Sequence, residues 1–180
     1  MIKKILPLVT ALTLSTQVMA NEDMHHEKES KFYVVAKALY TLGDTVEEET
    51  TTLDGDTGMG FGLDFGYRLE YGFAVEYDFS YSTNTVHAGA IEADADNMTH
   101  ALDLVYTYEA TEALGLFVKA GYEYEEESLE NDTTHDDGAV FGAGAEYALN
   151  HNYSLVAEYE HSTIEGPKGD SVFAGVMFNF

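Results

Sequence analysis

Apolar and polar residues alternate with a period of two along most of the chain after residue 31. The segments 32–41 (FYVVAKALYT) and 73–81 (FAVEYDFSY) illustrate the pattern. Successive side chains of a strand point to opposite faces, so this alternation predicts strands with one apolar face. The pattern recurs in eight segments: 32–41, 60–68, 73–81, 102–108, 116–124, 141–147, 153–160 and 171–180. No helical period of comparable length is present, and the sequence therefore predicts an all-β fold.

The connections between these segments alternate in length. Short connections lie near 69–72, 109–114 and 148–152. Long connections lie near 43–57, 86–97, 126–137 and 164–169, and the first and third of these are dense in Asp and Glu. Long loops at one end and short turns at the other are typical of an antiparallel up-and-down barrel, here with eight strands.

The two faces of the predicted strands differ in character. One face carries aromatic and aliphatic side chains, and the other combines glycines with charges such as Lys37, Arg68 and Lys119. A soluble barrel of the lipocalin kind fits the period-two pattern equally well, but it would turn its large apolar residues inward. Small residues with a few charges suit the narrow interior of an eight-stranded barrel instead. The pattern therefore favours a barrel whose apolar face points outward.

Aromatic residues of the apolar face gather near the strand ends. One rim is predicted to hold Phe32, Tyr67, Phe73, Tyr108, Tyr147, Tyr153 and Phe180, and the other Tyr40, Phe61, Tyr81 and Tyr124. Two aromatic belts around an apolar band are what the two interfaces of a membrane favour. Backbone groups in lipid must all be paired, so the sheet has to close. The fold class predicted is an eight-stranded antiparallel up-and-down transmembrane β-barrel.

The start of the chain has the pattern of a secretory signal peptide. Two lysines at positions 3 and 4 precede the apolar run ILPLVTALTL, and small residues stand at Val18 and Ala20. This run is shorter than the roughly 20 residues of a spanning helix. We expect residues 1–20 to be a signal peptide, 21–30 a short disordered segment, and 31–180 the barrel domain. An exported barrel of this kind predicts the outer membrane of a Gram-negative bacterium as its location.

The composition excludes some partners and offers few catalytic or metal-binding groups. The formal net charge of −25 argues against nucleic acid, since few basic groups could neutralise phosphates. The chain has no cysteine. The stretch DGDTG at 54–58 is similar to the beginning of a calcium loop, but the required later residues are missing. We therefore expect no metal and no cofactor.

Several segments resemble the OmpA-like transmembrane domain family. They are FYVVAKALY at 32–40, GYRLEYGFAVEYDFSY at 66–81, FVKAGYEY at 117–124 and GAGAEYALNHNYSLVAEYEH at 142–161. The resemblance implies a small eight-stranded outer-membrane barrel that is a monomer and contacts outer-membrane lipids and lipopolysaccharide. It also implies that the last strand, with Val176, Phe178 and Phe180, is a signal read by the β-barrel assembly machinery. One departure is Val156, which stands where the family carries a basic residue.

The inward charges are predicted to form a network in the lumen, the interior of the barrel. Its members are Lys37, Arg68, Glu76, Lys119, Glu146 and Glu158. A buried charge without a partner is costly, so Lys37 and Lys119 should be held by carboxylates, with Glu76 and Glu146 as the expected partners. Such a network would largely plug an eight-stranded barrel.

These features favour a structural and surface role in the outer membrane, with four acidic loops outside the cell. A narrow cation-preferring channel is the alternative. A lipid-modifying barrel enzyme is a third reading, suggested by the stretch EHS at 160–162. His161 and Ser162 are neighbours on a predicted strand and so face opposite sides, which prevents direct proton transfer between them. We expect no catalytic residues and no enzymatic activity.

Overall fold

The computed structural model describes residues 31–47, 52–129 and 132–180. The predicted signal peptide and the segment 21–30 lie outside these ranges. Within these ranges the chain forms ten strands: β1 Phe32–Thr41, β2 Thr45–Glu47, β3 Thr52–Gly55, β4 Gly58–Arg68, β5 Phe73–Ala88, β6 Ile91–Glu109, β7 Leu114–Leu129, β8 Asp132–Ala148, β9 Tyr153–Ser162 and β10 Ser171–Asn179. No helix within the described ranges is long and apolar enough to cross a membrane.

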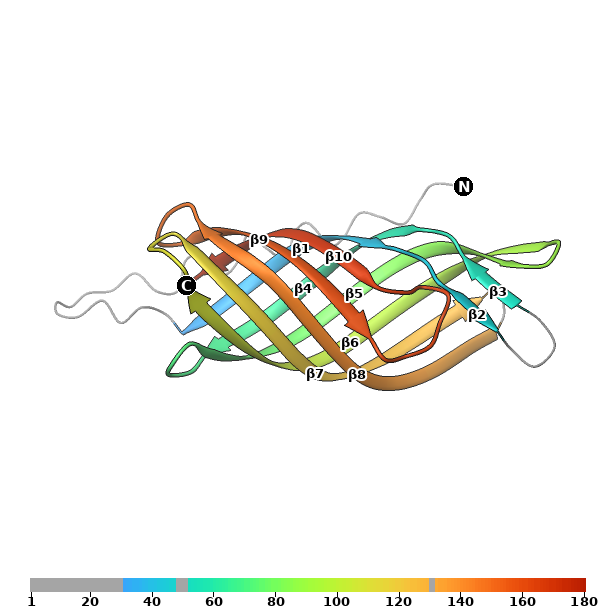
Figure 1. Cartoon of the computed structure of the whole chain (residues 1–180), viewed down its shortest axis with the longest axis horizontal. Helices are drawn as coiled ribbons and strands as arrows, with labels where there is room; N and C mark the ends of the chain where they lie inside the picture. Colours follow the sequence, from blue (N-terminus) through green and yellow to red (C-terminus); the bar gives the residue numbers. More distant parts are fainter. Residues whose placement is uncertain (1–30, 48–51, 130–131) are drawn as a thin grey trace, which may run out of the picture.

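Eight of the strands close into a barrel. Neighbours pair antiparallel around the ring in the order β1, β4, β5, β6, β7, β8, β9 and β10, and β10 pairs with β1. Figure 1 shows the tilted strands wrapping around one long axis. Closure leaves no open edge in the ring, because the last strand satisfies the free side of the first. The predicted eight-stranded up-and-down barrel is confirmed.

The remaining strands belong to the connections at one end of the barrel. The short hairpin β2–β3 lies in the connection between β1 and β4, and β3 adds onto β5. We call this end, which carries the tips of β5–β6 and β7–β8, the long-hairpin end. The opposite end, with the turns after β4, β6 and β8, is the short-turn end. Phe32 and Phe180 also lie there, joined by a bond from the Phe180 N–H to the Phe32 carbonyl of 3.2 Å.

Two of the expected loops are strands. The sequence predicts loops at 86–97 and 126–137, but in the structure β5 continues to Ala88 and β7 continues to Leu129. The backbone pairing extends as far as Ala88 with Ile91 and Leu129 with Asp132. These extensions are mostly polar, with only scattered apolar residues such as Val86 and Ala95, so the hydrophobic period weakens while the backbone ladder goes on.

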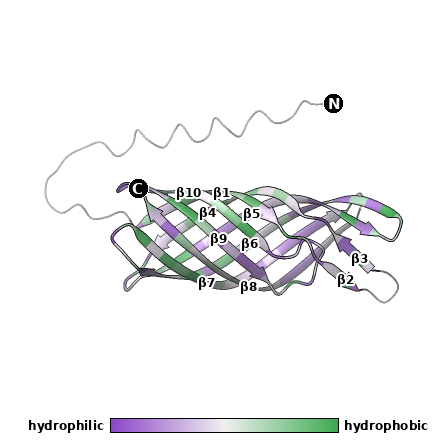
Figure 2. Ribbon diagram, turned by 45° about the horizontal axis from the view of Figure 1, so that its top comes forward, coloured by the Kyte–Doolittle hydropathy of each residue, from purple (hydrophilic) through white to green (hydrophobic). Residues whose placement is uncertain are grey.

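Burial confirms which face points inward. In β1 the alternation of exposed and buried residues places Tyr33, Val35 and Lys37 inside, and Phe32 and Tyr40 outside. Figure 2 shows hydrophilic and hydrophobic segments alternating along the barrel. The predicted rim aromatics are exposed except Tyr81, which is half-buried, and they include contacts such as Phe32 on Tyr67 at 4.8 Å between ring centroids. The apolar face is therefore the outer one, as the pattern predicted.

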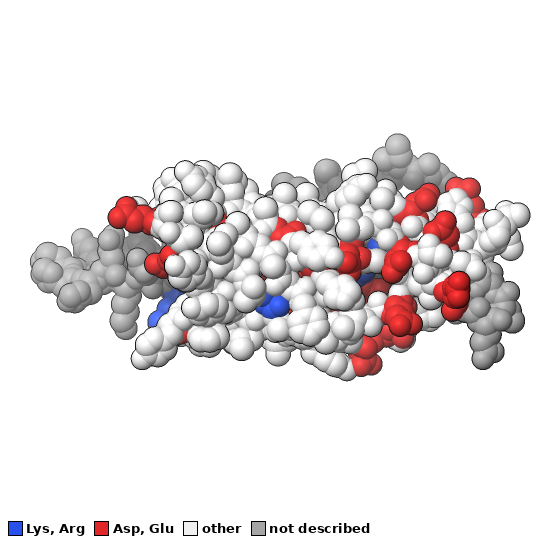
Figure 3. Space-filling view, in the orientation of Figure 1, with Lys and Arg blue, Asp and Glu red and all other residues white. Residues whose placement is uncertain are grey.

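Acidic side chains on the outside are unevenly distributed. In Figure 3 they gather mainly over the half of the barrel that carries the long-hairpin end, while the visible middle is largely uncharged. The turns at the other end are tight. Gly72 has a φ of +81°, and a Cβ there would lie 2.6 Å from the carbonyl oxygen of Thr107. This turn thus needs a glycine.

Candidate functional site: the charged interior of the barrel

Two fully buried lysines lie in the middle of the lumen. Lys37 comes from β1 and Lys119 from β7, and both side chains have an exposed fraction of 0%. Each lies directly opposite glycine across the sheet: Lys37 opposite Gly62 and Gly175, and Lys119 opposite Gly142. A Cβ on Gly142 would approach the Lys119 side chain to 2.6 Å. The glycines of the inner face therefore leave room for the long lysine stems.

Lys37 is held by three carboxylates. Its Nζ lies 2.8 Å from Asp64 Oδ1, 2.7 Å from Asp78 Oδ2 and 3.6 Å from Glu158 Oε2. The ammonium also lies 4.1 Å from the centroid of the Phe173 ring, within the range of a cation–π contact. These groups come from β4, β5, β9 and β10, so this one lysine ties together several sectors of the barrel wall.

Lys119 is held by four carboxylates, two of which it shares with Lys37. Its Nζ lies 2.6 Å from Glu158 Oε1 and 2.7 Å from Glu160 Oε2. It also lies 3.1 Å from Asp78 Oδ2 and 3.7 Å from Asp103 Oδ2. We call the connected group the ion network: Lys37, Asp64, Asp78, Asp103, Lys119, Glu158 and Glu160. Because Asp78 and Glu158 each contact both lysines, the network is continuous across the lumen.

The expected partners Glu76 and Glu146 are not the ones the structure places against the lysines. The Glu76 carboxylate accepts a hydrogen bond of 2.7 Å from the Tyr33 hydroxyl. Glu146 accepts one of 2.8 Å from Ser154 and lies 3.6 Å from Arg68. Arg68, with a side chain 37% exposed, also donates to Asn179 at 2.9 Å near the short-turn end. Of the six predicted members, Lys37, Lys119 and Glu158 meet in one cluster. Arg68 and Glu146 form a separate ion pair, and Glu76 pairs with Tyr33 instead.

The network contains more acid than base. Two ammonium groups face five carboxylates. Among the described residues, both carboxylate oxygens of Asp103 lack a hydrogen-bond partner, although this residue is only 2% exposed. Lys119 at 3.7 Å is the cation nearest to it in the network. The network therefore has a formal surplus of negative charge.

A cluster of apolar side chains, which we call the apolar layer, lies in the lumen between the ion network and the short-turn end. Its buried members are Tyr33, Val35, Ala74, Val105, Val156 and Met177, with Phe117 packed against them. Val156, which departs from the family pattern, is one of these residues. The alternation placed them inside, but nothing in the sequence indicated that the register would bring them to one level.

The C-terminal strand completes the outer surface. Val176 is exposed and pairs with Ala36 of β1 and Leu155 of β9. The Phe178 ring lies 5.2 Å from that of Tyr153 and 4.9 Å from that of Phe180. The predicted assembly residues thus form part of the aromatic rim at the short-turn end.

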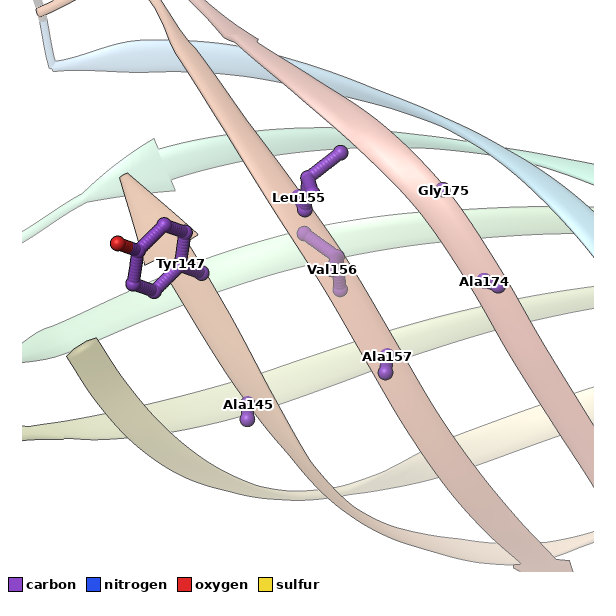
Figure 4. A pocket seen from close by; sticks show the side chains of 7 residues that line it. All are labelled: Ala145, Tyr147, Leu155, Val156, Ala157, Ala174 and Gly175. Atoms are coloured by element: carbon purple, nitrogen blue, oxygen red, sulfur yellow. The ribbon is translucent and has the colours of Figure 1, made fainter. Parts of the chain in front are cut away.

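A shallow hollow of about 350 Å³ lies on the wall formed by β8, β9 and β10. Ala145, Ala157 and Ala174 are directly opposite one another in the strand register, and small side chains leave the space. Figure 4 shows the residues that line it: Ala145, Tyr147, Leu155, Val156, Ala157, Ala174 and Gly175. Its almost wholly apolar lining offers no catalytic group.

His161 and Ser162, the neighbours that suggested an enzyme, have different hydrogen-bond partners on opposite sides of the barrel wall. Ser162 donates a hydrogen bond to Glu123 inside the barrel, while His161 Nδ1 lies 2.7 Å from Asp170 on the outside. In the described part of the chain, no group of three or more His, Asp or Glu side chains is arranged to hold a metal ion.

A closed ring of eight antiparallel strands, apolar outside and charged inside, defines an outer-membrane β-barrel. The chain belongs to the outer membrane protein beta-barrel domain family, whose sequence profile matches residues 6–180. The resemblance to small eight-stranded outer-membrane barrels is thereby confirmed, and the protein is located in the outer membrane. In this class the longer loops lie outside the cell and the short turns face the periplasm.

Solved structures of similar fold come from several bacteria. OprG from Pseudomonas aeruginosa has a TM-score of 0.67 at 15% identity, with 84% of this chain and 97% of OprG covered. Neisserial surface protein A has a TM-score of 0.61 at 19% identity, with coverages of 86% and 100%. Ail of Yersinia pestis has a TM-score of 0.55 at 16% identity, with coverages of 84% and 99%. A search of curated proteins finds no match. At these identities the similarity shows the fold alone.

Proposed function

We propose that the protein is a structural and surface component of the outer membrane, with a lumen closed to solutes and no enzymatic activity. The observation that carries this proposal is the ion network, which spans the lumen with two lysines of zero side-chain exposure. The apolar layer adds a second obstacle on the periplasmic side. An eight-stranded barrel has an interior only wide enough for side chains, so the two layers together leave little space for solutes.

The surface part of the proposal rests on the extracellular hairpins. The first connection contains Asp54 and Asp56, and the β7–β8 hairpin contains Glu126 and Asp136. Ail has been crystallised in complex with the heparin analogue sucrose octasulfate. A polyanion of that kind is an unfavourable ligand for acidic hairpins, so we propose cationic groups and cation-bridged lipopolysaccharide as their partners.

The two remaining partners belong to the membrane itself. We propose that outer-membrane lipids cover the exposed apolar wall and that the β-barrel assembly machinery reads the strand ending in Phe180. The protein would act as a monomer, since the ring is closed and no strand edge of the barrel is left for a second copy.

A narrow cation-preferring channel is the second candidate, and one observation favours it. The five carboxylates of the ion network exceed its two ammonium groups, and Asp103 has no hydrogen-bond partner among the described residues. Water molecules or small cations that pass beside the network would experience a negative electrostatic potential along their path.

Flux measurements on proteoliposomes separate the two candidates. Purified protein is reconstituted, and the release of potassium, chloride and a small sugar is followed against empty vesicles and vesicles with a general porin. The proposal predicts rates near those of empty vesicles for all three solutes. Fast potassium release alone would establish the cation channel, and rapid sugar release would refute a closed lumen.

A further inference from the structure

The extracellular mouth of the barrel contains a buried ammonium group that does not come from the barrel wall. Lys168 lies in the connection between β9 and β10, yet it is only 7% exposed. Its Nζ forms an ion pair with Glu125 of β7 and donates a hydrogen bond of 3.2 Å to Thr99 Oγ1 of β6. A long polar side chain of a surface connection is ordinarily solvated, so its burial here needs a reason.

The groups that receive Lys168 belong to the barrel wall. The Thr99 hydroxyl accepts a hydrogen bond from Lys168 and donates one of 3.1 Å to Glu125 Oε2. This second bond holds the Thr99 and Glu125 oxygens next to each other, on either side of the ammonium position. Thr99 and Glu125 are 6% and 5% exposed. They sit on neighbouring strands in direct register, so the wall itself sets their separation. The receptor for the ammonium is thus part of the rigid barrel.

A second buried carboxylate, two residues before Glu125 on β7, is incompletely paired. Glu123 is 1% exposed; Ser162 donates to its Oε1, but its Oε2 has no partner among the described residues. Burial by itself would lower the pKa of Lys168, but the pKa is raised because Glu125 and Glu123 attract the charged form. An ammonium has three N–H donors, which matches a site made of a hydroxyl and carboxylates.

The connection that supplies Lys168 is folded over the mouth and held by its backbone. The N–H groups of Gly43 and Asp44 donate to the carbonyls of Lys168 and Pro167 at 3.0 and 3.1 Å. Gly55 of β3 allows the close approach, since a Cβ there would lie 1.9 Å from the Pro167 carbonyl oxygen. Asn84 of β5 also donates to the Pro167 carbonyl at 3.5 Å. None of these bonds belongs to the strand pairing of the barrel, so their loss would leave the barrel ladder intact.

We propose that Thr99, Glu123 and Glu125 form a binding site for primary ammonium groups at the extracellular mouth, occupied in this state by the chain's own Lys168. The ligand class is a primary amine cation on a slender alkyl chain. When Lys168 leaves, the same three residues face the outside and take such a group in its place. The side chain therefore acts as a tethered, exchangeable ligand.

Chemical rescue of Lys168→Ala tests this site. The variant is folded into lipid vesicles, and its thermal unfolding midpoint is measured with n-propylammonium chloride, which replaces the three deleted methylenes and the ammonium. Tetramethylammonium chloride at equal concentration supplies the same charge without N–H donors. We expect the variant to lose several degrees, propylammonium to restore most of the loss, and tetramethylammonium to restore little. Equal effects of the two salts, or no restoration by either, would overturn the proposal.

Three further variants complete the test. Lys168→Met keeps a side chain of similar length, so it can be measured where Lys168→Ala does not fold. We expect it to be less stable than the wild type and not to be rescued by propylammonium, because the methionine still occupies the space that the amine would need. If Lys168→Ala folds only when propylammonium is present, the recovered yield is itself the rescue. Glu125→Gln combined with Lys168→Ala should abolish the response, and an undiminished response would place the amine elsewhere. Lys31→Ala, an exposed lysine at the other end, should show neither loss nor rescue.

Discussion

Replacing Lys119 by methionine removes the charge at the centre of the ion network while keeping a stem of similar size. Glu160 and Asp103 have Lys119 as their cation in the network, whereas Asp78 and Glu158 keep Lys37 at 2.7 and 3.6 Å. Two carboxylates would therefore be left buried without a counter-ion. Removing one partner of a buried pair costs about 3–5 kcal/mol, and we expect a loss of unfolding free energy in that range.

Lys37→Met gives an internal comparison. Within the network, only Asp64 depends on Lys37 alone, because Lys119 still contacts Asp78 and Glu158. The structure therefore predicts a smaller loss of unfolding free energy than for Lys119→Met, about 3 kcal/mol, at the lower end of the same range. Lys31→Met, an exposed position, should change the free energy by less than about 0.5 kcal/mol.

The assay is urea unfolding in lipid vesicles, followed by far-ultraviolet circular dichroism and by heat-modifiable migration on gels. The chain has no tryptophan, so tyrosine supplies any fluorescence signal. Adding Glu160→Gln to Lys119→Met should recover part of the loss, with a coupling of about 0.5–3 kcal/mol. A loss below about 1 kcal/mol for Lys119→Met, or a larger loss for Lys37→Met, would refute the assigned partners.

Three other predictions test the rim, the topology and an extracellular contact. Phe180→Asp should reduce the amount of heat-modifiable protein in the membrane without reducing synthesis, because it puts a charge on the aromatic rim beside Phe178. Tyr71→Asp, in an exposed turn, is the control. Equal amounts of the two variants in the membrane would argue against an assembly role for Phe180. An epitope inserted after Gly89, in the turn between β5 and β6, should be stained on intact cells, while one after Glu112 should require permeabilisation; the reverse result would invert the topology. The hydrogen bond from His87 to Asp56, at 3.1 Å, raises the pKa of His87, so its contribution is full below the ordinary value of 6.5 and is lost as pH rises through the raised pKa. Asp56→Asn should return the pKa of His87, measured by NMR titration, toward 6.5, and an unchanged value would exclude this partner.

The sequence was sufficient to predict the barrel and the faces of its strands. Period-two alternation gives the side of each residue directly, and it placed Lys37, Lys119 and Glu158 inside. It could not predict which carboxylate meets which lysine. That choice depends on the stagger between strands, which sets Asp64 and Asp78 at the level of Lys37 and leaves Glu76 beside Tyr33. The alternation along one strand shows which face a residue lies on, but it does not show which residues of the neighbouring strand lie at the same position along the barrel axis.

Two other features left no signal in the hydrophobic pattern. The extensions of β5 to β8 are mostly polar and do not alternate clearly between apolar and polar residues, so their backbone pairing was not predicted. Lys168 is a single lysine next to Pro167 in a connection, and only the three-dimensional path of the chain brings it to Glu125. A pairing of this kind, made by residues 43 positions apart through a loop, has no local sequence pattern.

Planar-bilayer recordings of the wild-type protein test the central claim, that the ion network closes the lumen, most directly. Single insertions are recorded in symmetrical potassium chloride, and selectivity is measured under a salt gradient. The buried lysines and their five carboxylates predict no stable open level, with at most a small cation-preferring leak. The Lys37→Met and Lys119→Met double variant should increase that leak and keep its preference for cations. A large, stable conductance in the wild-type protein, above all one that prefers anions, would contradict both the closure of the lumen and the sign of its charge.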